Sequence, residues 1–153
     1  MRHLSATLIA TYIFVATPAH AQEREWTLDA ASEDAFLVFG VPQTEDVGVS
    51  LWCKIGSGKI TLMTPESGSK LRDGVAAPMA VSVQGKTYGL QGRTSIGSDA
   101  GSGSVETELK PNDPLFEALE KADRFSLEAA GHKTTFPLLD ADVAGLLKLC
   151  RTT

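Results

Sequence analysis

Residues 49–55, Val-Ser-Leu-Trp-Cys-Lys-Ile, are the stretch that decides the fold. Every second side chain from Val49 to Ile55 is apolar or a thiol, and Ser, Trp and Lys stand between them. A period of two is that of a half-buried β-strand, whose alternate side chains face the core. The pattern therefore predicts a strand with Cys53 on its core face and Trp52 on the opposite face.

Short segments divided by glycine and proline extend from this strand in both directions, which favours many strands over long helices. Gly56-Ser57-Gly58 predicts a hairpin turn, and similar turns are expected at Gln84-Gly85 and at Gly131. Further strands are expected at residues 26–28, 35–39, 59–64, 79–83, 88–90, 105–109, 125–127 and 136–138. Residues 97–104, rich in Gly and Ser, predict a mobile, protease-sensitive loop.

Two short helices are expected near the C-terminus. Asn112-Asp113-Pro114 is typical of a helix start, with a capping side chain followed by proline in the first turn. In the second helix Asp140 is expected to cap the start and Asp142 to lie in the first turn. Its apolar stripe ends at Cys150, seven residues after Val143. The sequence thus predicts a mainly β (α+β) fold, an antiparallel sandwich or strongly bent sheet with two helices.

The first 21 residues have the order of a secretory signal peptide. Arg2 is followed by an apolar run from Leu4 to Ala16, and Ala19-His20-Ala21 places small residues where signal peptidase cleaves. The apolar run is shorter than the roughly 20 residues that span a bilayer. We expect cleavage between Ala21 and Gln22, leaving residues 22–153 as a single periplasmic or secreted domain without membrane insertion.

Cleavage would leave a mature chain of 132 residues with 13 basic and 19 acidic side chains, a net charge of −6. An acidic surface is poorly suited to nucleic acid, whose phosphates require a basic patch. It also disfavours binding to anionic lipid headgroups. The charge therefore excludes neither a protein nor a small-molecule partner, and its simplest consequence is solubility.

Cys53 and Cys150 are the two cysteines of the chain. In an oxidising compartment an even pair indicates a disulfide, although two free thiols or an intermolecular bridge are alternatives. Two separate periodicities, one of a strand and one of a helix, direct both sulfur atoms toward the core. We therefore predict a disulfide that ties the C-terminal helix to the sheet.

Motifs for catalysis, cofactors or metals are lacking in this sequence. His132 would be the one histidine left after cleavage, and it follows Gly131 in a predicted turn. There is no Gly-x-Ser-x-Gly elbow and no Cys-x-x-Cys pair, and Gly58-Lys59 lacks the Ser or Thr that a phosphate-binding loop requires next. We expect a domain that is not an enzyme, with no cofactor and no metal.

Trp52 allows two interpretations. If its side of the strand faces water, it marks a possible binding patch. If the fold is two layers deep, it belongs to a second layer of the core, which is the interpretation the sequence favours. The strand order and the oligomeric state stay open.

A set of residues spread over most of the mature chain follows the pattern W…A…L-x-(Y/F)-G-x-P-x-(S/T)-(D/E)…C…C. It comprises Trp26, residues 35–42, Thr44-Glu45-Asp46, Cys53 and Leu146-Leu147-x-x-Cys150. Its most specific part is the turn Phe39-Gly40-Val41-Pro42 together with the two Cys. The pattern resembles that of small exported bacterial proteins of unassigned function, with Glu45 where that pattern has Asp. The resemblance implies a common fold and secretion, and it brings no activity with it.

The expected function is that of a non-catalytic envelope domain that binds an unidentified protein or small ligand. One alternative is a structural or accessory envelope component without a specific ligand. A second alternative is a hydrolase that uses His132 with a nearby acid.

Overall fold

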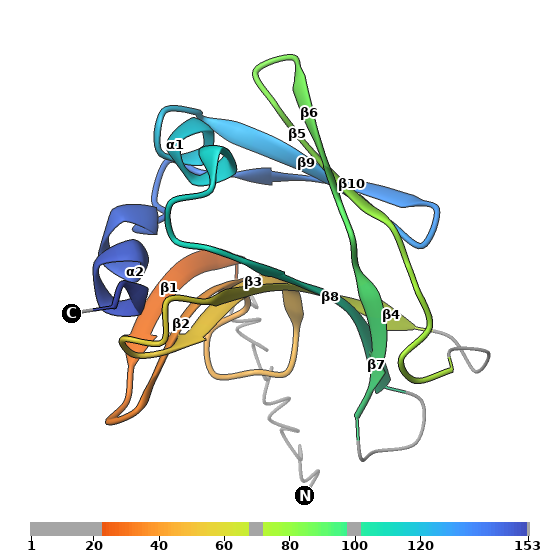
Figure 1. The fold of residues 1–153 in the computed structure, drawn as a ribbon, viewed down its shortest axis with the longest axis horizontal. Coiled ribbons are helices and arrows are strands. Elements are labelled where there is room, and N and C mark those ends of the chain that lie inside the picture. The colour runs from red at the N-terminus through yellow and green to blue at the C-terminus, as the bar shows by residue number, and fades with distance from the viewer. Residues whose placement is uncertain (1–22, 68–71, 98–101, 153) are drawn as a thin grey trace, which may run out of the picture.

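The structure, a computed structural model, describes residues 23–67, 72–97 and 102–152. Within them lie ten strands and two helices (Figure 1): β1 (Glu25–Ala30), β2 (Asp34–Gly40), β3 (Val47–Lys54), β4 (Ile60–Ser67), β5 (Met79–Val83), β6 (Lys86–Leu90), β7 (Arg93–Ile96), β8 (Ser102–Leu109), α1 (Pro114–Glu120), β9 (Arg124–Ala129), β10 (His132–Pro137) and α2 (Val143–Cys150). The predicted leader and its cleavage site at Ala21 and Gln22 lie outside the described residues, as do positions 98–101 of the predicted loop.

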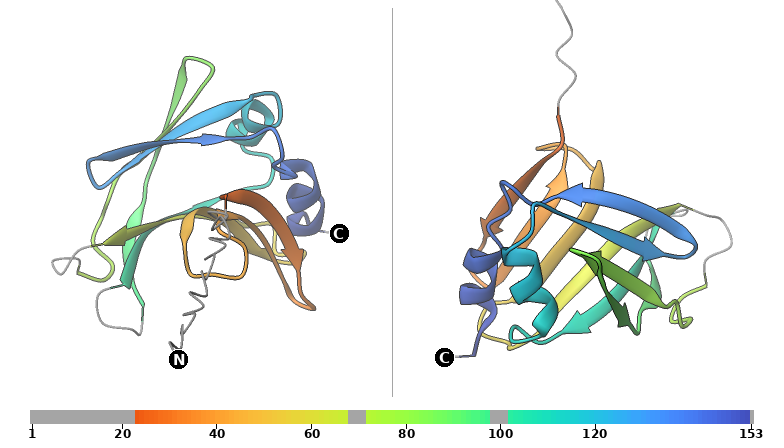
Figure 2. Two further views of the ribbon diagram at one scale, coloured as in Figure 1. Left: turned by 180° about the vertical axis from the view of Figure 1, so that it is seen from behind. Right: turned by 90° about the horizontal axis from the view of Figure 1, so that it is seen from above.

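The strands form two antiparallel sheets. The six-stranded sheet has the order β1-β2-β3-β4-β8-β7, and the four-stranded sheet has the order β10-β9-β5-β6. Figure 1 shows the six-stranded sheet curving beneath the four-stranded one, and Figure 2 shows the two helices together at one end of the sheets. The predicted mainly β fold with two short helices is confirmed.

Alternating side chains of both sheets meet in one core. Leu37, Leu51 and Leu62 lie side by side on β2, β3 and β4, and all three are almost fully buried. Val81 on β5 and Leu127 on β9 form the matching pair in the four-stranded sheet. At one end, neighbouring aromatic rings have their centroids 5.3–6.5 Å apart: Trp26, Phe39, Phe125 and Phe136. The period-two pattern thus identifies the core face of β2, β3, β4, β5 and β9.

The three predicted hairpins are present. Gly56 and Gly58 take positive φ angles of 70° between β3 and β4, a conformation that glycine adopts without strain. Ile55, however, was expected on the core face of β3 and is 39% exposed. The strand ends at Lys54, and the backbone N–H of Ile55 donates to the carbonyl oxygen of Glu33 as the chain enters the turn.

Both helices begin with an aspartate cap. The carboxylate of Asp113 accepts from the N–H of Leu115, as predicted for α1. In α2 the cap is Asp142, whose carboxylate accepts from the N–H of Gly145, and the expectation that Asp140 would be the cap is wrong. The helix starts two residues later than predicted because Asp142 can reach the free N–H groups of the first turn.

Two pairings were not expected from the sequence. The short polar strand β7 (Arg93–Ile96) pairs with β8, and β8 begins at Ser102, three residues before the expected start at Val105. Residues 102–104 therefore belong to a strand that is bordered by β4 on one side and by β7 on the other. Local apolar periodicity is absent there, so the pairing depends on neighbours that are distant in sequence.

The predicted disulfide is confirmed. Cys53 on β3 and Cys150 on α2 are bonded, with their Cα atoms 5.8 Å apart and 97 positions apart in the chain. Both residues are almost fully buried. The turn after β3 adds backbone hydrogen bonds to the same helix, from Gly56 to Leu149 and from Gly58 to Cys150. The C-terminal helix is thus fixed to the sheet at several adjacent points.

Candidate functional site

An apolar patch lies on the face of the six-stranded sheet that points away from the core. We call it the outer patch: Phe36, Val38, Trp52 and Met63, from β2, β3 and β4. The four side chains are half-buried, and Ser50, which lies between Val38 and Met63 in the strand register, is only 4% exposed. Figures 1 and 2 show no described helix or strand against this face. The patch is therefore a packed apolar surface that the rest of the described fold leaves uncovered.

Trp52 lies between Phe36 on β2 and Thr61 on β4 in the strand register. It is directly opposite Phe36 in the register of β2 and β3, and the two rings stack at an angle of 21° with centroids 6.1 Å apart. Trp52 is absent from the buried core, which contains the inward residues Leu51 and Cys53 on either side of it. The expectation that Trp52 belongs to a second core layer is wrong: the fold has two layers, but this side chain is on the outside of one of them.

A groove continues the patch toward the edge of the sheet. This outer groove, with a volume of about 480 Å³, lies between the outer face of β1 and β2 and the loop 41–46. Phe36 and Val38 belong to both the patch and the groove, and Val41 and Pro42 add apolar surface from the loop. The two features therefore form one continuous surface.

The loop 41–46 holds a defined shape through its own hydrogen bonds. The hydroxyl of Thr44 donates to the carbonyl oxygen of Val41 and accepts from the N–H of Asp46. A Cβ atom added at Gly40 would clash with the carbonyl oxygen of Asp46, so the loop returns closely over this glycine. These residues belong to the pattern Phe-Gly-x-Pro-x-Thr noted in the sequence, which was the available signal for the groove.

Acidic side chains border the outer groove. Glu25, Asp29 and Asp46 line it, and its lining contains no lysine or arginine. Asp46 forms an ion pair with Arg24, whereas no ion pair joins Glu25 or Asp29 to a basic side chain within the described residues. The groove thus offers two free carboxylates beside an aromatic ring.

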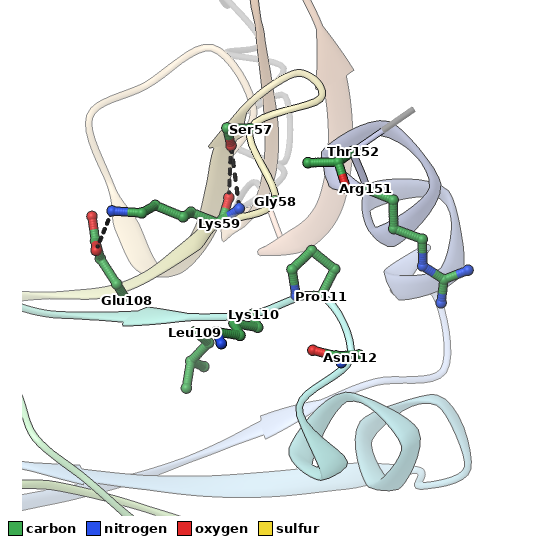
Figure 3. A pocket seen from close by; sticks show the side chains of 10 residues that line it. All are labelled: Ser57, Gly58, Lys59, Glu108, Leu109, Lys110, Pro111, Asn112, Arg151 and Thr152. Carbon is green, nitrogen blue, oxygen red and sulfur yellow. Dashed lines mark hydrogen bonds and ion pairs between the residues drawn. The ribbon is translucent and has the colours of Figure 1, made fainter.

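A cavity of about 680 Å³ lies where the β3–β4 turn meets the end of α2 (Figure 3). Lys59, Lys110 and Arg151 line it, which suggests an anion site at first sight. Figure 3 shows, however, that Lys59 extends toward Glu108, with which it forms an ion pair, and that Arg151 points away from Lys59. The cationic groups do not converge on one point, so they do not form an anion site in this cavity.

Glu106 and Glu108, two residues apart on β8, have separate partners. Glu106 accepts from the hydroxyl of Ser104, and Glu108 is paired with Lys59. Across the described parts of the chain, no three His, Cys, Asp or Glu side chains are grouped as metal ligands. In the same residues, no helix is long and apolar enough to cross a membrane.

His132 is exposed at the start of β10. It lines an opening of about 520 Å³ between the sheets, together with Thr64, Thr134 and the ion pair of Arg24 with Asp46. The described residues give His132 no hydrogen bond or ion pair to a carboxylate, and Asp46 is engaged by Arg24. A hydrolase that uses His132 stays a prediction from the sequence.

Comparison of the chain with protein-family models, curated proteins and solved structures yields no significant match. The likeness to small exported bacterial proteins consequently stays a prediction from the residues.

Proposed function

We propose that this chain is an exported cell-envelope protein whose domain 22–153 binds a protein or small ligand, without catalysis, through the outer patch. The observation that carries the proposal is the stacked pair Phe36 and Trp52 on an uncovered sheet face. Exposing large aromatic side chains to water is unfavourable, and an apolar surface bordered by polar residues commonly marks a binding site. Tryptophan is also enriched among residues that contribute most to binding energy.

Two features support the assignment to an oxidising compartment, periplasmic or extracellular. The leader has the order of a secretory signal, and the two cysteines form a buried disulfide. Structural disulfides persist where no reducing thiol pool acts on them. The outer patch would then meet partners of the envelope rather than of the cytoplasm.

Export gives a direct test. Mass spectrometry of protein recovered from the periplasmic or secreted fraction is expected to show a chain that starts at Gln22, shorter by 21 residues than the full sequence. A chain with Met1 intact in the soluble fraction would contradict the proposed compartment.

The binding surface is tested by a photo-crosslinking amino acid placed at Thr61, which lies opposite Trp52 in the register of β3 and β4. We expect a crosslinked product of discrete mass in intact cells, and we expect Trp52→Ala to reduce it about tenfold, as for a residue central to an interface. Tyr88→Ala, which removes a half-buried aromatic ring from the other sheet, is the matched control and should leave the product unchanged.

A second crosslinker at Thr135, on the exposed strand β10, controls for random contacts. Equal products from Thr61 and Thr135, or none from Thr61, would favour a structural or accessory component without a specific ligand.

A further inference from the structure

The edge strand β1 leaves backbone hydrogen-bonding groups unpaired beside the outer groove. In the β1–β2 hairpin the N–H of Ala31 donates to the carbonyl oxygen of Asp34, and Ala30 pairs with Ala35. Hydrogen-bonded and non-hydrogen-bonded pairs alternate in an antiparallel ladder. Ala31 and Asp34 form a hydrogen-bonded pair, so Ala30 and every second residue before it on β1 belong to non-hydrogen-bonded pairs with β2. The N–H and C=O groups of Trp26, Leu28 and Ala30 therefore point to the free edge, where no strand of the described residues pairs with them.

The opposite edge of the same sheet is closed. Residues 74–77 run along β7, with Gly74 donating to the carbonyl oxygen of Thr94, Thr94 donating to that of Val75, and Ala77 donating to that of Gly92. The hydroxyl of Thr94 donates to the carbonyl oxygen of Arg72 in the same segment. One edge of the six-stranded sheet is thus protected by its own chain, and the other, β1, is open.

The side chains of β1 show what kind of strand could fit. Glu25, Thr27 and Asp29 lie on the outer face of β1 and line the outer groove. An antiparallel strand added at the free edge would meet them in non-hydrogen-bonded pairs, in which opposing side chains approach most closely. Its residues opposite Glu25 and Asp29 would lie four positions apart, with one residue facing Thr27 between them.

The charges disfavour a second copy of this chain in the register that is centred on Thr27. Two β1 strands paired antiparallel about Thr27 would place Glu25 of each copy opposite Asp29 of the other. Like charges directly opposite destabilise a strand pair, whereas opposite charges stabilise it. The matching strand is therefore basic, and a long Lys or Arg side chain on it could reach the ring of Phe36 across the groove.

We propose that β1 accepts an extended segment of a partner protein by strand addition, with Lys or Arg at two positions four residues apart facing Glu25 and Asp29. Backbone hydrogen bonds supply the affinity in this mode of recognition, and side-chain pockets beside the edge supply the specificity. The inference rests on the proposed function, because it names the partner class for the same surface.

The test uses the mature, disulfide-bonded protein and the acetylated, amidated peptide Ser-Val-Lys-Val-Thr-Val-Lys-Val-Ser. Its two lysines are four positions apart and so face the same side of a strand. A peptide of equal composition, with the lysines three positions apart, places them on opposite sides and is the matched control. We expect the first peptide to bind at least tenfold more tightly, and to protect the amides of Trp26, Leu28 and Ala30 from hydrogen exchange.

Two further comparisons separate strand addition from plain charge attraction. N-methylation of the valines on either side of the central threonine removes the donors that would face β1 and should abolish binding, whereas N-methylation of the lysines should leave it unchanged. The double variant Glu25→Gln, Asp29→Asn should weaken binding about tenfold, the effect of two cross-strand ion pairs. Glu120→Gln with Asp123→Asn, two exposed acids near α1, should not change it.

Three results would each overturn the inference. They are equal binding of both peptides, unchanged hydrogen exchange at β1 on adding the first peptide, and no binding at about 1 mM peptide. If the crosslink at Thr61 still depends on Trp52 in that case, the proposed function stands and strand addition alone is wrong. If the crosslink at Thr61 is also missing, both the proposed function and strand addition are wrong.

Discussion

Replacing Cys53 or Cys150 with Ser is expected to lower the free energy of unfolding by about 2–5 kcal/mol. The bond joins residues 97 positions apart, so its loss releases a long loop in the unfolded chain. It also places a hydroxyl in a site that is 2% exposed at Cys53 and fully buried at Cys150. Denaturant unfolding of each single variant and of the wild type measures the difference.

The double variant provides the control for this prediction. The two residues act as a unit, so replacing both should cost little more than replacing one. Thiol labelling of the unfolded, unreduced wild-type protein should detect no reactive thiol. Two labelled cysteines per chain, or single variants as stable as the wild type, would contradict the role of the bond in holding α2 on the sheet.

Periodicity in the sequence was sufficient to predict the elements that carry their own pattern. Alternation around Leu51 and the helical stripe before Cys150 placed both sulfur atoms on the core side, and the bond between them follows from those two facts. The sequence signal for the hairpin turn at Gln84-Gly85 was also local, because a two-residue turn with positive φ angles favours glycine. Signals of this kind act over a few residues and do not depend on the rest of the fold.

What could not be predicted depends on contacts between distant residues. β7 has no alternating apolar pattern, and it exists because β8 and residues 74–77 lie on either side of it. Leu115, Phe116 and Leu119 of α1 are all buried, and the burial of the adjacent Leu115 and Phe116 depends on the elements packed around the helix. The strand order could not be predicted for the same reason, because no single segment specifies its neighbours.

The candidate site, too, could be predicted from the sequence only in part. The sequence placed Trp52 on the face opposite the core, but could not show whether a second layer covers that face. Its partner Phe36 lies 16 positions earlier in the chain, and only the register of β2 and β3 brings the two rings together. The outer groove also needs the loop 41–46 to return over Gly40, which the pattern Phe-Gly-x-Pro marked without indicating its geometry.

Trp26→Ala is expected to lower the free energy of unfolding by about 3–5 kcal/mol, the usual cost of removing a large buried aromatic side chain. Trp26 is 8% exposed and packs against Phe39 and Phe125, in opposite sheets. Its indole N–H donates to the carbonyl oxygen of Pro137, 2.6 Å away, which joins the first strand of one sheet to an edge strand of the other. The substitution removes both the packing and this hydrogen bond.

Trp52→Ala is the matched control, because the chain has two tryptophans and the second lies outside the core. It should cost about 1 kcal/mol, since a half-buried side chain on a sheet face leaves no enclosed cavity behind. Urea unfolding, monitored by far-ultraviolet circular dichroism rather than by tryptophan fluorescence, compares the free energies of unfolding of the two variants. Equal losses would mean that Trp52 supports the fold as much as Trp26 does, and the case for the outer patch as a binding surface would lose its main observation. A large loss for Trp26 alone would leave Trp52 as an aromatic side chain that the fold itself hardly requires.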